Sequence, residues 1–113
     1  MATTNNILPP IVGTIIKIAV TANLGKNIHM VDVDFNCVVF NRNNGGQRGS
    51  ITLQKGDMIY VGDDEYIAVV DTTVIGRGDY YIKFSADVPD SDCTDGIRKE
   101  IVEIPTGIRV DFR

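Results

Sequence analysis

Three aspartates in one short stretch are the residues of this sequence whose spacing could bind a cation. Asp90, Asp92 and Asp95 lie in the segment VPDSDCTDG, residues 88–96. Carboxylate oxygens are preferred calcium ligands, but an EF-hand loop starting at Asp90 would have threonine at position 5 and isoleucine at position 12. The EF-hand pattern therefore fails. An aspartate-rich turn capped by its own side chains is the favoured interpretation, with weak cation binding as the alternative.

The other residue types that could catalyse a reaction have no partners in the sequence pattern. His29 is the only histidine, so it cannot form a metal site built from several imidazoles. Ser50, Ser85 and Ser91 lie outside any nucleophile motif. We therefore expect no catalytic residue and no enzymatic activity.

Two further charged motifs fit turns better than binding sites. Asp63, Asp64 and Glu65 are consecutive, and on a turn such side chains point in different directions, which favours a solvated turn over a metal site. Residues 77–79 read Arg-Gly-Asp, a tripeptide that suggests integrin binding in secreted proteins. Without an export signal, the pattern is that of a tight turn between strands.

The composition fits one small globular domain. The chain has 113 residues and is 43% hydrophobic, and its 15 acidic and 11 basic residues give a net charge of −4. That sign is wrong for non-specific phosphate binding, so we expect no nucleic-acid partner. The N-terminus has no basic segment before an apolar run, and the longest apolar runs are far short of a membrane span. We expect no membrane partner, no cofactor and synthesis in the cytosol.

The two cysteines, Cys37 and Cys93, decide little about the fold. A reducing compartment keeps thiols free, and two free thiols are therefore the expectation, with a disulfide between them as the alternative.

Residues 51–104 indicate the fold class. Short alternations of apolar and polar residues are separated there by turns rich in glycine and aspartate, and no window repeats at helical period. About seven or eight strands with turns every 8–12 residues are typical of sandwiches and barrels. We predict an all-β protein with one β-sandwich of Greek-key or jelly-roll type, and a small closed barrel is the alternative.

The alternation also predicts individual strands and their buried faces. In residues 29–40 the odd positions are apolar, which places Cys37 in the core, and in residues 80–86 the even positions are apolar. A hairpin is expected around the acidic turn, and tight turns are expected at residues 76–79 and 105–107. The expected strands cover residues 14–20, 29–40, 51–53, 58–61, 66–70, 80–86, 97–104 and 108–112.

The N-terminal residues 1–13 form an expected extended arm before the sandwich domain, residues 14–113. Two prolines remove two backbone donors and fix φ, so they favour an extended segment. The arm would lie on its own domain or reach a neighbouring subunit, and both alternatives stay open. Its candidate contact residues are Ile7, Leu8, Pro9 and Pro10.

The loop at residues 41–50 is the second candidate contact element. It has three glycines, but neither the Walker spacing nor the G-x-G-x-x-G pattern of phosphate-binding loops is present. Loop tips on a β-scaffold often carry binding residues. The candidate contact residues in the loop are Arg42, Asn43, Asn44 and Arg48.

The C-terminal half resembles small β domains encoded by phages and prophages of Bacteroides-type bacteria. The shared pattern is a strand of alternating aromatic and polar residues, a "(I/V)PD.D..DG.R.E" stretch and a final "TGI.V" strand. The domain is similar to the N-terminal anchoring domain of phage baseplate or fibre proteins, although those proteins continue into a stalk and tip whereas this chain stops at Arg113. The matching residues are Val88-Pro89-Asp90, Asp92, Asp95-Gly96, Arg98, Glu100 and Thr106-Gly107-Ile108.

This resemblance implies a structural virion protein made in the host cytoplasm. A multi-copy head-decoration subunit, or a subunit that anchors a fibre or tail, would form homo-oligomers and contact other virion proteins through the arm and the loop. The alternative is a carbohydrate- or ligand-binding β-module, assisted by calcium at the Asp90–Asp95 loop. Its stacking residues would come from four tyrosines, of which we expect at least two in the core. They are Tyr60, Tyr66, Tyr80 and Tyr81.

Overall fold

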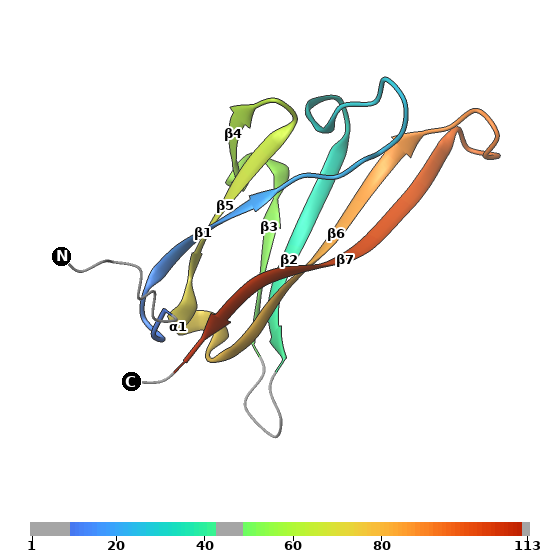
Figure 1. Ribbon diagram of the computed structural model, residues 1–113. Coiled ribbons are helices and arrows are strands. Elements are labelled where there is room, and N and C mark those ends of the chain that lie inside the picture. Colours follow the sequence, from blue (N-terminus) through green and yellow to red (C-terminus); the bar gives the residue numbers. More distant parts are fainter. Residues whose placement is uncertain (1–9, 43–48, 112–113) are drawn as a thin grey trace.

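Two antiparallel sheets face each other in the computed structural model, which describes residues 10–42 and 49–111 (Figure 1). Together they confirm the predicted all-β sandwich, with seven strands in the described ranges. The three-stranded sheet has the order β1 (Ile15–Val20), β5 (Glu65–Asp71) and β4 (Ile59–Gly62). The four-stranded sheet has the order β3 (Ser50–Gln54), β2 (Asp34–Arg42), β6 (Gly78–Pro89) and β7 (Ile97–Val110).

The strand order identifies a Greek-key arrangement of the immunoglobulin type. In that fold, strands B, E and D form part of one sheet, and C′, C, F and G form the other, which is the order seen here for β1-β5-β4 and β3-β2-β6-β7. Where the first strand of the immunoglobulin fold would lie, the described residues form one parallel β-bridge, between Ile11 and Asp111.

The core lies between the sheets and follows the predicted alternation. Cys37 is fully buried, as expected, and Phe35 from the same strand packs against Tyr66 and Phe84 with ring centroids 5.0 and 5.2 Å apart. Burying aromatic side chains of this size contributes a large part of the apolar area that stabilises a small domain. Other fully buried core residues are Val20, Val39, Val70, Tyr80, Ile82 and Val88.

A one-turn helix, α1 (Thr72–Ile75), precedes the tight turn predicted at residues 76–79, and β6 begins within that predicted turn, at Gly78. Asp71 caps the helix because its Oδ1 accepts a hydrogen bond from the Thr73 N–H at 2.9 Å. Just beyond, the Tyr80 hydroxyl donates to the Gly76 carbonyl at 2.5 Å. This contact is the tyrosine corner of immunoglobulin-type sandwiches.

The strand predicted from residue 29 begins later, at Asp34. Met30–Asp32 form a 3₁₀ turn, η1, which leaves Val31 45% exposed rather than buried. The cause is a long-range contact, since Asp64 Oδ1 accepts a hydrogen bond from the Met30 N–H at 2.6 Å. The predicted hairpin between β4 and β5 is confirmed, and Asp63 and Asp64 both have the positive φ of a type I′ turn.

The turn predicted at residues 105–107 is a bulge within β7. Register shifts between the Tyr81–Pro105 pair and the Asp79–Arg109 pair, so the strand continues instead of reversing. Thr106 supports the bulge because its hydroxyl donates to the Tyr80 carbonyl at 2.8 Å. A second short 3₁₀ turn, η2 (Lys55–Asp57), connects β3 to β4.

Candidate functional site

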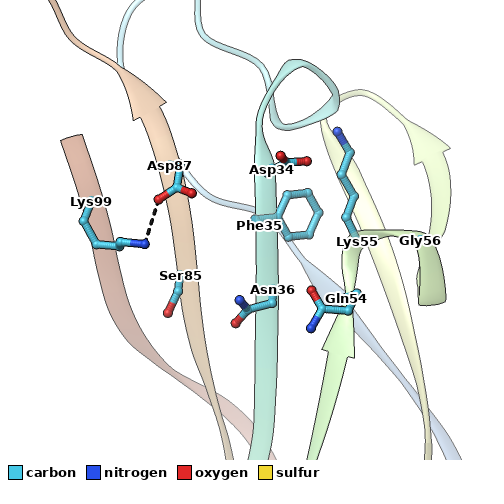
Figure 2. Close-up of a pocket in the computed structure, with 9 residues that line it drawn as sticks. All are labelled: Asp34, Phe35, Asn36, Gln54, Lys55, Gly56, Ser85, Asp87 and Lys99. Atoms are coloured by element: carbon cyan, nitrogen blue, oxygen red, sulfur yellow. Dashed lines mark ion pairs between the residues drawn. The ribbon is translucent and has the colours of Figure 1, made fainter. Parts of the chain in front are cut away.

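A polar trough on the outer face of the four-stranded sheet is the candidate binding site (Figure 2). Its volume is about 420 Å³, within the range of small-ligand pockets. Four strands or their ends supply the side chains, which point away from the core. The polar lining residues are Asp34, Asn36, Gln54, Ser85, Asp87 and Lys99.

Strand register brings these residues together. Asn36 in β2 lies opposite both Gln54 in β3 and Ser85 in β6, so three uncharged polar side chains form one row across the sheet. Asp87 pairs with Lys99 Nζ at 2.8 Å, as the dashed line in Figure 2 marks. Both ion-pair partners are about half exposed, so the pair contributes at most about 1 kcal/mol to stability.

One end of the trough is fixed by Lys55. Its ammonium donates hydrogen bonds to the carbonyls of Val31 and Val33 at 2.7 and 2.8 Å, so it ties η2 to the chain that enters β2. The Gln54 side chain accepts from the Asp57 N–H in a capping box. The Gln54 side chain therefore keeps its amide N–H groups available to a ligand.

The trough can exchange hydrogen bonds with a polar ligand such as a polyol. Its amides and hydroxyl both donate and accept, whereas the ring of Phe35 beneath it belongs to the core and is 4% exposed. Within residues 10–42 and 49–111, no group of three or more His, Cys, Asp and Glu side chains is arranged to hold a metal ion.

The aspartates of the predicted cation cluster serve the turn between β6 and β7. Asp90 accepts a hydrogen bond from the Asp92 N–H at 2.9 Å and forms an ion pair with Arg98 at 2.8 Å. Asp95 accepts from the Ile97 N–H at 3.1 Å. The Asp92 N–H first, and then Arg98, lower the pKa of Asp90. These contacts match the capped turn that the sequence favours.

Two of the candidate contact residues, Arg42 and Pro10, lie in the described ranges. Arg42 lies 4.5 Å from the ring centroid of Tyr81 and forms an ion pair with Glu103 on the outer face of the larger sheet. The Pro10 carbonyl accepts a hydrogen bond from the N–H of Asp111, which follows the edge strand β7, at 2.9 Å. The remaining predicted contact residues lie outside the described ranges, and they are Ile7, Leu8, Pro9, Asn43, Asn44 and Arg48.

The histidine, the two cysteines and two of the tyrosines singled out from the sequence occupy structural positions. His29 caps η1 without a side-chain hydrogen bond to the backbone. Cys37 and Cys93 are both free, and burial raises the pKa of the Cys37 thiol to about 11. Tyr66 and Tyr80 are buried, which confirms that at least two tyrosines belong to the core.

An apolar surface that the sequence reasoning missed covers the outer face of the three-stranded sheet. Ala19 in β1 lies opposite Ile67 in β5, which lies opposite Ile59 in β4, so one apolar row crosses all three strands. Ile59 is 52% exposed. The signal was present in the sequence, because IIKIAV and YIAVV are apolar at both odd and even positions. The apolar outer face comprises Ile15, Ala19, Ile59, Ile67 and Val69.

Comparisons with protein-family models, with curated proteins and with solved structures found no match to this chain. The described helices are short, and none has the length and apolar character needed to cross a membrane.

Proposed function

We propose that this chain is a non-catalytic structural subunit of a bacteriophage particle. It is present in many copies and decorates the head or anchors a fibre or tail. The observation that carries the assembly role is the apolar outer face of the three-stranded sheet. The phage assignment itself rests on the resemblance of the C-terminal half to small phage and prophage β domains.

The two outer faces of the sandwich differ in a way that favours assembly. An antiparallel sheet that faces water is normally polar on its outer side, as the row of Gln54, Asn36 and Ser85 is. The outer side of the three-stranded sheet instead presents the apolar row formed by Ala19, Ile67 and Ile59. Contiguous apolar patches on small proteins usually mark contact surfaces.

Charges on the apolar outer face are compatible with a second copy of this chain. Lys17 lies opposite Val69, and Asp71 lies opposite Ile15, so the face carries both signs within one strand pair. A two-fold axis would bring Lys17 of one copy toward Asp71 of the other, because each residue in such an interface meets its counterpart reciprocally.

The test of self-association uses two lysine substitutions on exposed edge-strand positions. Ile59→Lys places a charge in the apolar outer face, and Thr52→Lys places the same charge on the polar face of the other sheet. We expect concentration-dependent oligomers of the full-length chain in light scattering, weakened at least about tenfold by Ile59→Lys, which is about 1.4 kcal/mol. Thr52→Lys should leave the oligomer unchanged. A chain that stays monomeric at every concentration would contradict self-association.

The phage assignment needs a separate measurement. Particles are purified on a density gradient from an induced host culture that carries the gene, and their proteins are quantified by mass spectrometry. We expect tens of copies of this chain for each particle. Its absence from intact particles, when other virion proteins are recovered, would contradict the proposal.

A ligand-binding β-module is the second candidate, and the polar trough is the observation that favours it. Binding to a glycan array, with and without calcium, would be compared for the wild type, Asn36→Ala and the control Thr52→Ala. A ligand of the trough would lose binding with Asn36→Ala only. Equal signals for all three proteins would exclude the trough as a glycan site.

A further inference from the structure

The strand β7 gives the four-stranded sheet a long, regular edge. It stands last in the strand order, and among the described residues its segment 97–105 pairs with β6 alone (Figure 1). The register of that pairing is unbroken from Ile97 to Pro105, and the bulge comes only beyond it. These residues present about 30 Å of strand edge. A long edge without a bulge is the template to which another strand adds.

The backbone groups of the odd-numbered residues point out of this edge. At the turn that joins β6 to β7, the Asp90 N–H donates to the Gly96 carbonyl at 2.9 Å, so even-numbered residues of β7 direct their backbone groups toward β6. The odd-numbered residues therefore direct theirs away from the sheet. Pro105 fits this alternation, because its missing N–H falls on the outward side and costs the ladder with β6 nothing.

Large apolar side chains are exposed along the same segment. Ile101 lies on the outer face of the sheet between Lys99 and Glu103, and it is 57% exposed. Ile97 on the same face and Val102 on the other are also exposed. Each has a cross-strand neighbour on the β6 side, and a strand added at the edge would supply a neighbour on the other side.

We propose that the 97–105 segments of two copies of this chain pair antiparallel about a two-fold axis at Ile101. The pairing joins two four-stranded sheets into one continuous sheet and sets each Ile101 opposite its counterpart. Lys99 then lies opposite Glu103 of the second copy, and Ile97 lies opposite Pro105 of the second copy. This contact rests on the proposed multi-copy role and adds to the contact through the apolar outer face, which belongs to the other sheet.

Charge complementarity selects a second copy as the occupant of the edge. Lys99 and Glu103 each form an ion pair within their own chain and keep much of the side chain exposed, so a further opposite charge can approach them. Across the joined sheet the signs alternate from strand to strand, which is the favourable order for cross-strand neighbours. The two-fold axis forms this row twice. The row consists of Asp87, Lys99, and Glu103 and Lys83 of the second copy.

Neighbouring registers lose this match. Each side chain must stay on its own face of the sheet, so the nearest alternatives move the axis by one residue. An axis at Glu100 would set two glutamates opposite each other, and an axis at Val102 would set Ile101 opposite Glu103. With the axis at Ile101, the proline falls in the last pair, where its carbonyl can still accept from the Ile97 N–H of the second copy.

Sedimentation of Ile59→Lys isolates this contact, because that substitution disrupts the apolar outer face on the other sheet. We expect a concentration-dependent dimer of the full-length Ile59→Lys chain. Adding Ile101→Lys sets two lysines against each other at the axis and should weaken the dimer at least about tenfold. Adding Thr52→Lys instead, on the same outer face but at the opposite edge strand β3, should leave the dimer unchanged.

Engineered disulfides test the register in a Cys93→Ser background, in which the remaining Cys37 is buried. Ile101→Cys should form a disulfide-linked homodimer under mild oxidation, because directly opposed residues have Cα atoms about 5.5 Å apart. Lys99→Cys alone should not, since its counterpart would lie about 13 Å away along the strand. A mixture of the Lys99→Cys and Glu103→Cys chains should cross-link.

Two results would overturn the pairing. An Ile59→Lys chain that stays monomeric while the wild type forms oligomers would leave the apolar outer face as the contact and exclude the β7 edge. Cross-linking of Lys99→Cys to itself as fast as Ile101→Cys would exclude the register. In contrast, a wild-type dimer that cross-links through Ile101→Cys and is unaffected by Ile59→Lys would support the pairing and contradict the contact through the apolar outer face.

Discussion

Tyr80 joins the helix α1 to the start of β6 through one buried hydroxyl. The side chain is 1% exposed, and its hydroxyl is the donor to the Gly76 carbonyl. Tyr80→Phe removes the donor and leaves a carbonyl without this partner, which should lower the free energy of unfolding by about 1–2 kcal/mol. Denaturant unfolding measures the loss. The control Tyr81→Phe lies on the outer face and should change stability by less than about 0.5 kcal/mol.

The same residue predicts a loss of stability at alkaline pH. Burial first, and then Asp71, raise the pKa of Tyr80 from 10.0 to about 12. Between these values the unfolded chain releases the phenolic proton while the folded chain keeps it, so rising pH favours unfolding. Cys37 acts in the same direction between its ordinary pKa of 9.0 and about 11. We expect unfolding free energy to fall from about pH 9 to pH 12, and less steeply in Tyr80→Phe. An identical slope in both proteins would contradict this role.

At the scale of elements, one glycine sets how closely α1 approaches β3. A Cβ atom on Gly49 would lie 2.6 Å from the Ile75 carbonyl oxygen and 2.8 Å from that of Val74. Both are backbone atoms, so Gly49→Ala should destabilise the fold by about 2 kcal/mol. Gly56→Ala in η2 is the matched control, since no atom lies within 4 Å of its added Cβ. Equal melting temperatures for the two variants would show that α1 can move away.

Alternation of apolar residues was enough to predict the strands, because each buried face repeats every second residue. It could not predict η1 or α1, which depend on single side chains: Asp64 reaches Met30 from a distant hairpin, and Asp71 caps a helix of one turn. The bulge at Thr106 has a similar cause, since its hydroxyl bonds to the neighbouring strand.

The candidate site was harder to predict than the fold. The trough exists because Asn36, Gln54 and Ser85 share one row, and strand register between distant segments cannot be counted from the sequence. The turn at Asp90 could be predicted because its partners are local in sequence. For the whole chain, the resemblance to phage domains remains a proposal.

At the scale of the whole molecule, net charge and the apolar outer face act against each other during self-association. Each copy carries a charge of −4, which repels a second copy. Screening shortens the Debye length from about 30 Å at 0.01 M salt to about 8 Å at 0.15 M, while apolar contacts persist. We expect the apparent Kd for self-association to fall as salt is added, measured by sedimentation. Weaker association at high salt would indicate that ion pairs dominate.

The elongated sandwich, 53 × 36 × 20 Å, has a defined polarity along its length. The C-terminal end of β7 lies at one end, and the turn between β6 and β7 lies at the other (Figure 1). Pro10 is hydrogen-bonded to Asp111, the residue that follows β7. A support that grips the molecule near these two residues would therefore display the turn of Asp90, Asp92 and Asp95 at its outermost point. An array of such subunits would present an anionic outer layer of regularly spaced tips, and the mutual repulsion of those tips would keep neighbours apart.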